Sequence, residues 1–342
     1  MSRRRGNQVG WLLSFIGSAL SVFGCSESLG PWDTYISIAP SGQELAFVGA
    51  GRGVKDLYRL SLKELRVTKV TDSRERELDV SYSPDRKTMV FTAMSAAGKA
   101  GHIYLCSLDG GGRRQLTGDA ALYDSEASFS PDGRQILFAR GFRRRPYAWG
   151  GWTWVDWDVC VMHCDGTHLR RITHENFNQM TRPRFSPDGR HIVFSGYGGG
   201  ESNLYLTDPE GATPPKLLPA GLDGRSPDWS PDGKQIIFTA DPENNCQPQI
   251  YALSPDGGRR RRITSNGKSC AWCVWTPDGR QIYFTVWFSK ERGTELWRIG
   301  EDGTGQCRVA DQTLFEDPTH WRPDGRAREP SGVDHGLPGS SA

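Results

Sequence analysis

The segment Ser130-Pro131-Asp132-Gly133, followed by Gln135-Ile136-Leu137-Phe138, decides the fold of this chain of 342 residues. Proline presets the backbone at the first central position of a turn, Asp tolerates the next conformation, and Gly closes the turn. The apolar, β-branched residues that follow are typical of a strand. This stretch therefore predicts a tight turn that leads into a β-strand.

The same turn recurs along the chain at a nearly constant spacing. Its prolines are spaced 44, 47, 56, 44, 46 and 46 residues apart, at Pro40, Pro84, Pro131, Pro187, Pro231, Pro277 and Pro323. A period of about 40–50 residues is typical of four-stranded propeller blades. A third strand such as 204–206, an Asp-Gly turn such as 108–110 and a fourth strand such as 262–264 complete each unit.

The repeat Ser-Pro-Asp-Gly-Lys/Arg-x-Ile-x-Phe, then Ile-Tyr, Asp-Gly and Leu/Ile-Thr, resembles the blade of the TolB-like β-propeller family, a relative of WD-repeat blades. The resemblance implies an all-β six-bladed propeller of four-stranded antiparallel blades over residues 33–325, without the α/β domain that precedes the blades in that family. Seven blades, the last incomplete, is the alternative. Residues 326–342 are rich in Gly, Pro and Ser, and we expect them to be disordered.

The N-terminus is predicted to be an export signal. Arg3, Arg4 and Arg5 precede an apolar run that ends at Cys25, and the residues before Cys25 are similar to a lipobox. We therefore predict a signal peptide over residues 1–25, acylation of Cys25 and a linker over residues 26–32. An ordinary cleaved signal and an uncleaved anchor remain open. Either a periplasmic or an outer-membrane lipoprotein is consistent with this start.

The charge balance limits the classes of partner. With 42 basic and 40 acidic residues, the formal net charge is +2, which gives no reason to expect binding to nucleic acid. We expect membrane contact only through a lipid anchor, and we expect a monomer. The four consecutive arginines Arg259–Arg262 start an outermost strand, where positive charge prevents edge-to-edge aggregation.

Strand order predicts one regular and one variable face. The Ser-Pro-Asp-Gly and Asp-Gly turns lie on one face, whereas the loops between second and third strands and the links between blades lie on the other, here called the loop-rich face. Loops held by a scaffold often carry function. The longest such loop contains types enriched at binding hot spots, and its predicted partner-binding residues are Arg143, Arg144, Arg145, Tyr147, Trp149, Trp152 and Trp154. The alternative is that its tryptophans fold back onto the blade and stack with arginine.

The innermost strands supply charged residues that could face a central channel. These predicted channel residues are Asp79, Glu126, Arg184, Asp228 and His320. They could hold an ion or a partner's side chains, or they could form hydrated salt bridges. Paired carboxylates would also suit a channel-based polysaccharide lyase or hydrolase.

Cysteine spacing and the search for catalytic motifs complete the sequence-based prediction. Cys246 and Cys270 are both expected on the loop-rich face, and a disulfide between them is possible because an exported protein permits one. No Gly-x-Ser-x-Gly motif or metal-spaced histidine pair occurs, so we predict neither a catalytic residue, nor a metal, nor a cofactor. We predict a non-enzymatic scaffold of the bacterial envelope that binds a protein or peptidoglycan-associated ligand, with an enzyme as the alternative.

Overall fold

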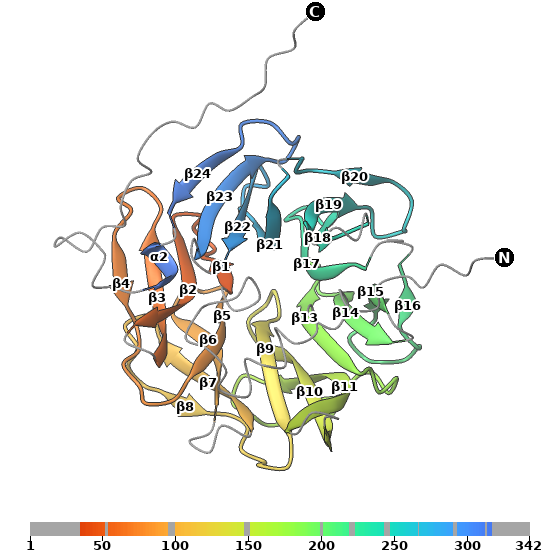
Figure 1. The fold of residues 1–342 in the computed structure, drawn as a ribbon. Coiled ribbons are helices and arrows are strands. Elements are labelled where there is room, and N and C mark those ends of the chain that lie inside the picture. The colour runs from red at the N-terminus through yellow and green to blue at the C-terminus, as the bar shows by residue number, and fades with distance from the viewer. Residues whose placement is uncertain are drawn as a thin grey trace, which may run out of the picture.

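The computed structural model describes residues 35–51, 54–94, 100–146, 151–198, 201–218, 223–242, 247–265, 267–289, 293–311 and 313–316. Within them, six antiparallel four-stranded sheets radiate from a common axis (Figure 1). This confirms the predicted six-bladed propeller. The predicted signal peptide, linker, seventh turn and tail lie outside the described residues.

Each sheet consists of four consecutive strands, which run in chain order from the axis outward. Blade 1 contains β1 (Ile36–Ile38), β2 (Glu44–Gly51), β3 (Val54–Ser61) and β4 (Val67–Lys69), and blade 2 contains β5 (Glu77–Tyr82), β6 (Thr88–Met94), β7 (Gly101–Ser107) and β8 (Arg114–Gln115). Blade 3 contains β9 (Tyr123–Phe129), β10 (Gln135–Pro146), β11 (Trp152–His163) and β12 (Arg170–Arg171), and blade 4 contains β13 (Gln179–Phe185), β14 (Ile192–Gly198), β15 (Glu201–Thr207) and β16 (Lys216–Leu217). Blade 5 contains β17 (Arg225–Trp229), β18 (Ile236–Ala240), β19 (Gln249–Leu253) and β20 (Arg260–Arg262), and blade 6 contains β21 (Ser269–Trp275), β22 (Gln281–Ser289), β23 (Gly293–Gly300) and β24 (Cys307–Ala310), followed by α2 (Thr313–Glu316).

Hydrogen bonds explain why the Ser-Pro-Asp-Gly turn recurs. In blade 3 the Ser130 hydroxyl donates to Asp132 Oδ1 at 2.6 Å, and the same carboxylate oxygen accepts the backbone N–H of Arg134 at 3.0 Å. The N–H of Gln135 donates back to Ser130 Oγ at 2.9 Å. Gly133 has a φ of 71°, a left-handed conformation that glycine adopts without steric cost. Serine, aspartate and glycine thus each have a separate task in closing the turn.

The hydrophobic core is divided among the seams between neighbouring blades. Six clusters of buried residues each draw mainly on two adjacent blades. The phenylalanine of the second strand is fully buried in every blade, at Phe47, Phe91, Phe138, Phe194, Phe238 and Phe284. The Ile-x-Phe part of the repeat therefore supplies the seams on which the ring depends.

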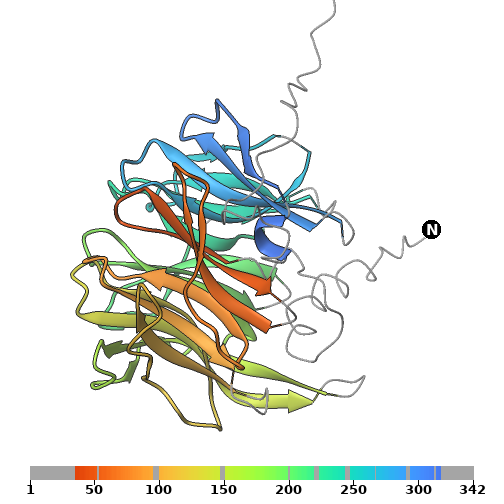
Figure 2. The ribbon, with the colours of Figure 1, turned by 90° about the vertical axis from the view of Figure 1, so that its left-hand side faces the viewer.

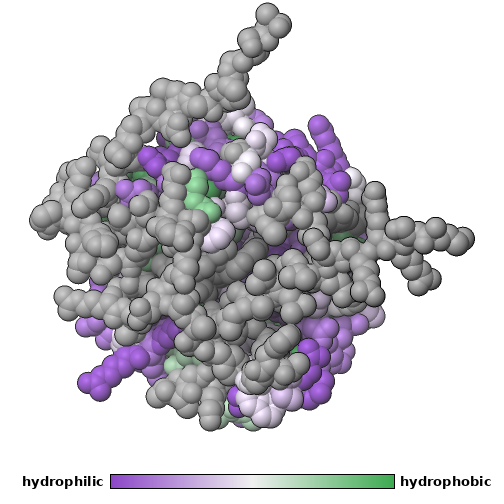
Figure 3. Space-filling model, in the orientation of Figure 1, coloured by the Kyte–Doolittle hydropathy of each residue, from purple (hydrophilic) through white to green (hydrophobic). Residues whose placement is uncertain are grey.

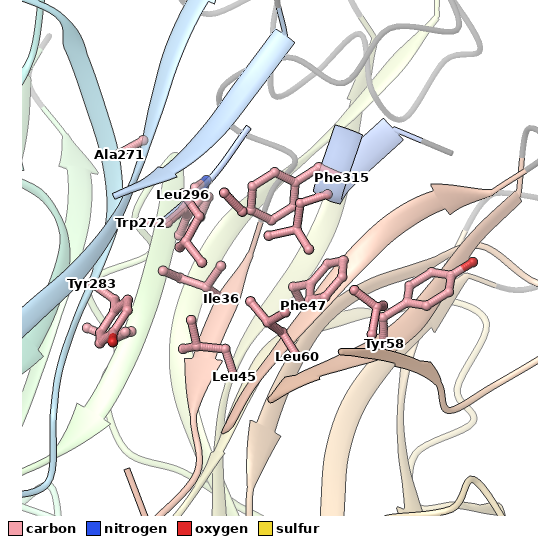
Figure 4. Packing of buried hydrophobic residues seen from close by; sticks show 14 residues of the cluster. Ile36, Leu45, Phe47, Tyr58, Leu60, Ala271, Trp272, Tyr283, Leu296 and Phe315 are labelled. Carbon is pink, nitrogen blue, oxygen red and sulfur yellow. The ribbon is translucent and has the colours of Figure 1, made fainter. Parts of the chain in front are cut away.

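The ring closes between blade 6 and blade 1 through side-chain packing (Figure 4). Phe315 of α2 meets Phe47 of β2 edge-on, with ring centroids 5.4 Å apart. A Cβ atom added at Gly42 would lie 3.4 Å from Cδ of Pro277, which places the turn of blade 1 against the turn of blade 6. Turns of blades 2 and 3 are related in the same way through Pro84 and Gly133, so the closing seam repeats the packing found elsewhere.

The antiparallel strand order places the Ser-Pro-Asp-Gly turns on one side of the disc and the end of the β10–β11 hairpin on the other. Figure 2 shows α2 and the end of the β10–β11 hairpin on the same side of the disc. Seen from that side in Figure 3, the described surface is mostly hydrophilic. No helix within the described residues is long and apolar enough to cross a membrane.

Candidate functional site

The innermost strands of the six sheets surround the propeller axis, and a repeated irregularity shapes them. The register between first and second strands shifts in blades 2 to 6. In four of these blades a residue at the shift has a left-handed backbone, namely Glu126, Arg182, Ser226 and Trp272, with φ between 40° and 60°. Bulges of this kind re-aim side chains and are frequent beside functional sites.

Carboxylates of one blade hold the bulge of the next. Asp79 Oδ2 accepts the backbone N–H of Glu126 at 2.8 Å, and Glu126 Oε2 accepts the backbone N–H of Arg182 at 2.8 Å. Asp228 Oδ2 instead accepts the N–H of Trp275, three residues beyond the bulge residue Trp272, at 3.1 Å. These channel acids therefore join blade 2 to blade 3, blade 3 to blade 4 and blade 5 to blade 6.

Side chains from distant blades meet on the axis. The hydroxyl of Tyr35, at the start of blade 1, donates to Glu126 Oε1 of blade 3 at 3.2 Å. The Tyr35 ring also packs on Trp272 of blade 6, with centroids 3.9 Å apart. The guanidinium carbon of Arg182 lies 5.5 Å from the centre of the Trp272 ring. We call Tyr35, Asp79, Glu126, Arg182 and Trp272 the axial ring.

Burial changes the proton affinities of the channel residues. Loss of hydration and the nearby Asp79 carboxylate raise the pKa of Glu126 to about 7. Burial likewise raises the pKa of Asp79 and of Asp228. Burial, reinforced by the Arg182 guanidinium, lowers the pKa of Arg184 to about 10. Buried groups of both charge signs thus lie close to one another near the propeller axis.

The structure brings four of the five predicted channel residues into this region. Asp79 lies on β5, Glu126 on β9, Arg184 on β13 and Asp228 on β17, and electrostatic interactions connect Arg184 with the other three. His320 lies outside the described residues. The described residues contain no group of three or more His, Cys, Asp or Glu side chains that could hold a metal ion.

Arg182, Tyr35 and Trp272 were not among the residues predicted from sequence. Arg182 lies four residues before Ser186, the same offset that separates Asp79 from Ser83 and Glu126 from Ser130. Tyr35 and Trp272 stand at the same offset from Ala39 and Thr276. Counting back from each turn would therefore have found all three.

The long loop of blade 3 is an extended β-hairpin. Strands β10 and β11 remain paired out to Pro146 and Trp152, five residues beyond Gly141, where β9 stops pairing with β10. Arg143 forms an ion pair with Asp156, and its Nε lies 2.5 Å from Oδ2. The hairpin is thus ordered by its own backbone ladder.

The aromatic residues of this hairpin divide into buried and exposed ones. Trp154 is buried in the seam between blades 3 and 4, whereas Trp152 is 48% exposed. The Arg144 guanidinium carbon lies 5.5 Å from the ring centres of both. Arg145 is exposed, and Tyr147 and Trp149 lie outside the described residues. Folding back and exposure, the two sequence-based alternatives, thus apply to different tryptophans.

The predicted cysteine pair is only half described. Cys270 is buried on β21, and Cys246 lies outside the described residues, as does Cys25. The disulfide and the acylation therefore remain predictions.

The repeat and the geometry agree with a known family. A family model described as the TolB beta propeller domain matches residues 155–327, half of the chain. The chain belongs to the TolB β-propeller family. This confirms the resemblance inferred from the Ser-Pro-Asp-Gly repeat.

Individual TolB relatives match over limited parts of their length. The chain is 37% identical over 84 residues to the Tol-Pal system protein TolB of Desulfotalea psychrophila, which covers 24% of this chain and 19% of that protein. It therefore spans about a fifth of the length of the curated relatives it matches.

Solved structures extend the similarity of fold beyond TolB. TolB from Acinetobacter baumannii superposes with a TM-score of 0.58 at 22% identity, covering 89% of this chain and 69% of that one. An oligogalacturonate lyase in complex with manganese superposes with a TM-score of 0.59 at 16% identity, covering 83% and 78%. At these identities the matches show the fold alone, and the fold serves both binding proteins and enzymes.

Proposed function

We propose that this TolB-family propeller is a non-enzymatic binding scaffold of the bacterial cell envelope, which holds a protein or peptidoglycan-associated partner on its loop-rich face. The curated relatives carry the name of a Tol-Pal system protein, which supports a place in an envelope assembly. The predicted export signal and acylation of Cys25 fit that location.

The observation that carries this proposal is the half-exposed Trp152 on the extended hairpin. Trp152 lies beside Arg144, and the exposed Arg143 and Arg145 belong to the opposite strand. Trp and Arg are the residue types that contribute most to binding at protein interfaces. An ordered strand pair also loses little conformational entropy when a partner binds.

Crosslinked pull-down from envelope fractions tests this proposal. The Trp152→Ser variant and the Arg145→Ser variant should each lose capture of partners that the unmodified chain retains. Leu217→Ser is the matched control, because Leu217 is 52% exposed but lies on β16, far out on blade 4. Equal capture by the Trp152 and Leu217 variants, or no reproducible partner of the unmodified chain, would count against the proposal.

A channel-based lyase or hydrolase is the second candidate, and one observation favours it. Glu126 has a pKa of about 7 beside a second carboxyl group, an arrangement typical of a general acid. However, Glu126 Oε1 and Oε2 already accept hydrogen bonds from the Tyr35 hydroxyl and the Arg182 N–H. Turnover of an oligosaccharide panel that disappears in the Glu126→Gln or Asp228→Asn variant would establish the enzyme.

A further inference from the structure

The end of the β10–β11 hairpin, which lies away from the axis, has one backbone edge without a neighbouring strand (Figure 1). Pairing between β9 and β10 stops at Gly141, opposite Tyr123, whereas β10 remains paired with β11 out to Pro146. The chain that enters β9 makes a turn over residues 119–122, closed by a backbone hydrogen bond of 3.1 Å, and so does not follow β10 further. Within the described residues, positions 142–146 of β10 therefore have a strand on one side only, and we call this side the open edge.

The other long edge of the hairpin is already occupied. The backbone of Trp157 exchanges two hydrogen bonds with that of Phe177, at 2.7 and 3.0 Å, where the chain leads into blade 4. The Trp154 carbonyl accepts the indole N–H of Trp157 at 2.9 Å. Trp154 and Val155 are both buried. The open edge of β10 is thus the side of the hairpin that can accept a further strand.

The open edge has the size and the order that strand addition requires. A strand edge presents unpaired N–H and C=O groups and is a template for pairing with another chain. Five residues are close to the usual length of a strand, and successive residues direct their backbone groups to alternate sides, so about half of these groups point outward. Because β11 already holds the backbone of β10 extended, a partner strand does not have to order it.

The charge on the open edge selects the kind of strand that can pair there. The edge contains three consecutive arginines, Arg143, Arg144 and Arg145. Arg143 has Asp156 as its ion-pair partner, whereas Arg144 and Arg145 form no ion pair within the described residues. A second copy of this strand would bring arginine beside arginine and would be repelled, whereas an acidic strand would be attracted.

The pleat of β10 specifies where the acidic residues must lie. Successive side chains of a strand point to opposite faces, so Arg143 and Arg145 share one face. Arg144 lies on the other face, where its guanidinium carbon is 5.5 Å from the ring centres of both Trp152 and Trp154. Side chains on the same face of neighbouring strands lie beside one another. A complementary strand therefore carries an acidic residue at every second position.

We propose that the open edge of β10 is a strand-addition site, which binds an extended segment of a partner protein with acidic side chains at every second position. Backbone hydrogen bonds to residues 142–146 supply the affinity, and the acidic side chains beside Arg143 and Arg145 supply the specificity. This inference rests on the proposed function for the identity of the partner, because the acidic strand would belong to the envelope protein held on the loop-rich face.

Peptide binding to the full chain, measured by isothermal titration calorimetry, tests the mode of recognition. The probes are acetyl-Thr-Glu-Val-Glu-Val-Glu-Thr-amide, the same peptide methylated on its five central backbone nitrogens, and trigalacturonate. We expect the unmodified Glu peptide to bind and the methylated peptide to bind at least tenfold more weakly, because it keeps the charges but loses the backbone donors. Equal binding of the two peptides, or binding of trigalacturonate alone, would overturn the proposal.

A charge exchange at Arg145 tests the location of the site. Arg145→Glu should weaken binding of the Glu peptide by about tenfold, since an attraction between strands becomes a repulsion. The same variant should gain binding of acetyl-Thr-Lys-Val-Lys-Val-Lys-Thr-amide. Arg134→Glu is the matched control, because Arg134 is an exposed arginine in a turn on the opposite face, and it should change neither affinity. Unchanged affinities in Arg145→Glu would refute the site.

Amide hydrogen exchange separates strand addition from contact through side chains alone. The Glu peptide should slow exchange of the backbone N–H groups at residues 142–145, and binding without any such slowing would refute strand addition. The proposed function fails separately from this site. Binding of the Glu peptide without any captured envelope partner would refute the proposed function and leave the site standing. Partner capture that depends on Trp152, without binding of the Glu peptide, would refute the site and leave the proposed function standing.

Discussion

The backbone N–H of Arg182 donates to Oε2 of Glu126 at 2.8 Å, so a carboxylate of blade 3 fixes the left-handed bulge of blade 4. The same carboxyl group reaches blade 1 through Tyr35. The Glu126 side chain thus connects three blades at the axis, and its protonation state affects the stability of the whole propeller.

Stability should fall as the pH rises from 4.5 toward neutrality. Burial raises the pKa of Glu126, and also that of Glu77, from 4.5 to about 7. Between pH 4.5 and 7 these two carboxyl groups keep their protons in the folded chain but have released them in the unfolded chain. Their contribution to the free energy of unfolding is therefore fully present below pH 4.5 and is lost as the pH rises past 7. We expect Glu126→Gln to remove roughly 2–3 kcal/mol of this dependence. Denaturant unfolding across the pH range measures it, with the exposed Glu301→Gln as control. An unchanged profile in Glu126→Gln would be inconsistent with this prediction.

Arg86→Gly should stabilise the protein. Arg86 occupies the turn position that glycine fills in the other described turns, and its φ of 59° is left-handed. Relief of that strain should add up to about 1 kcal/mol to the free energy of unfolding. The reverse change, Gly189→Ala, should cost about 1 kcal/mol, because an added Cβ there meets no atom within 4 Å and only the backbone is strained. Equal stability of all three proteins in urea would contradict this account.

Arg114→Met should loosen the seam between blades 2 and 3. The Arg114 guanidinium donates to the backbone oxygens of Cys164 and Asp165 at 2.8 and 2.9 Å. Arg170 and Arg261 reach the next blade in the same way, so arginines of the outermost strands join blades in addition to the edge protection inferred from sequence. We expect a loss of about 1 kcal/mol and faster amide exchange at residues 164–168. Arg134→Met, an exposed substitution within one turn, should change neither.

Phe315→Ala should open the closing seam. Phe315 is 1% exposed and packs on Phe47, so its loss should cost about 3–5 kcal/mol. Leu217→Ala, at an exposed position, should shift the urea midpoint very little. A similar small shift for both variants would show that α2 does not seal the ring.

The sequence carries the fold because one turn chemistry is repeated. Serine, aspartate and glycine of the Ser-Pro-Asp-Gly motif each make a contact that local sequence specifies, and the buried phenylalanines follow at a fixed offset. This is enough to predict strands, blades and the two faces.

The site is less predictable because it depends on contacts between blades. Burial of Trp154 beside an exposed Trp152 follows from the position of blade 4, which residues 141–154 do not encode. The left-handed backbone of Arg182 likewise depends on the Glu126 carboxylate, 56 residues earlier. In the sequence, the position of Arg182 is indicated only by its constant offset of four residues from the Ser-Pro-Asp-Gly turn.

Each of the six described sheets is built from consecutive strands, and in the part of the chain that the structure describes, side-chain packing closes the ring. A blade is therefore at once a stretch of coding sequence and a finished structural module. Duplication of one such stretch would add a complete blade whose two sides fit its neighbours, and the closing contact would re-form in a larger ring. A single genetic event of this kind would change the number of blades, and each blade would keep its own side chains.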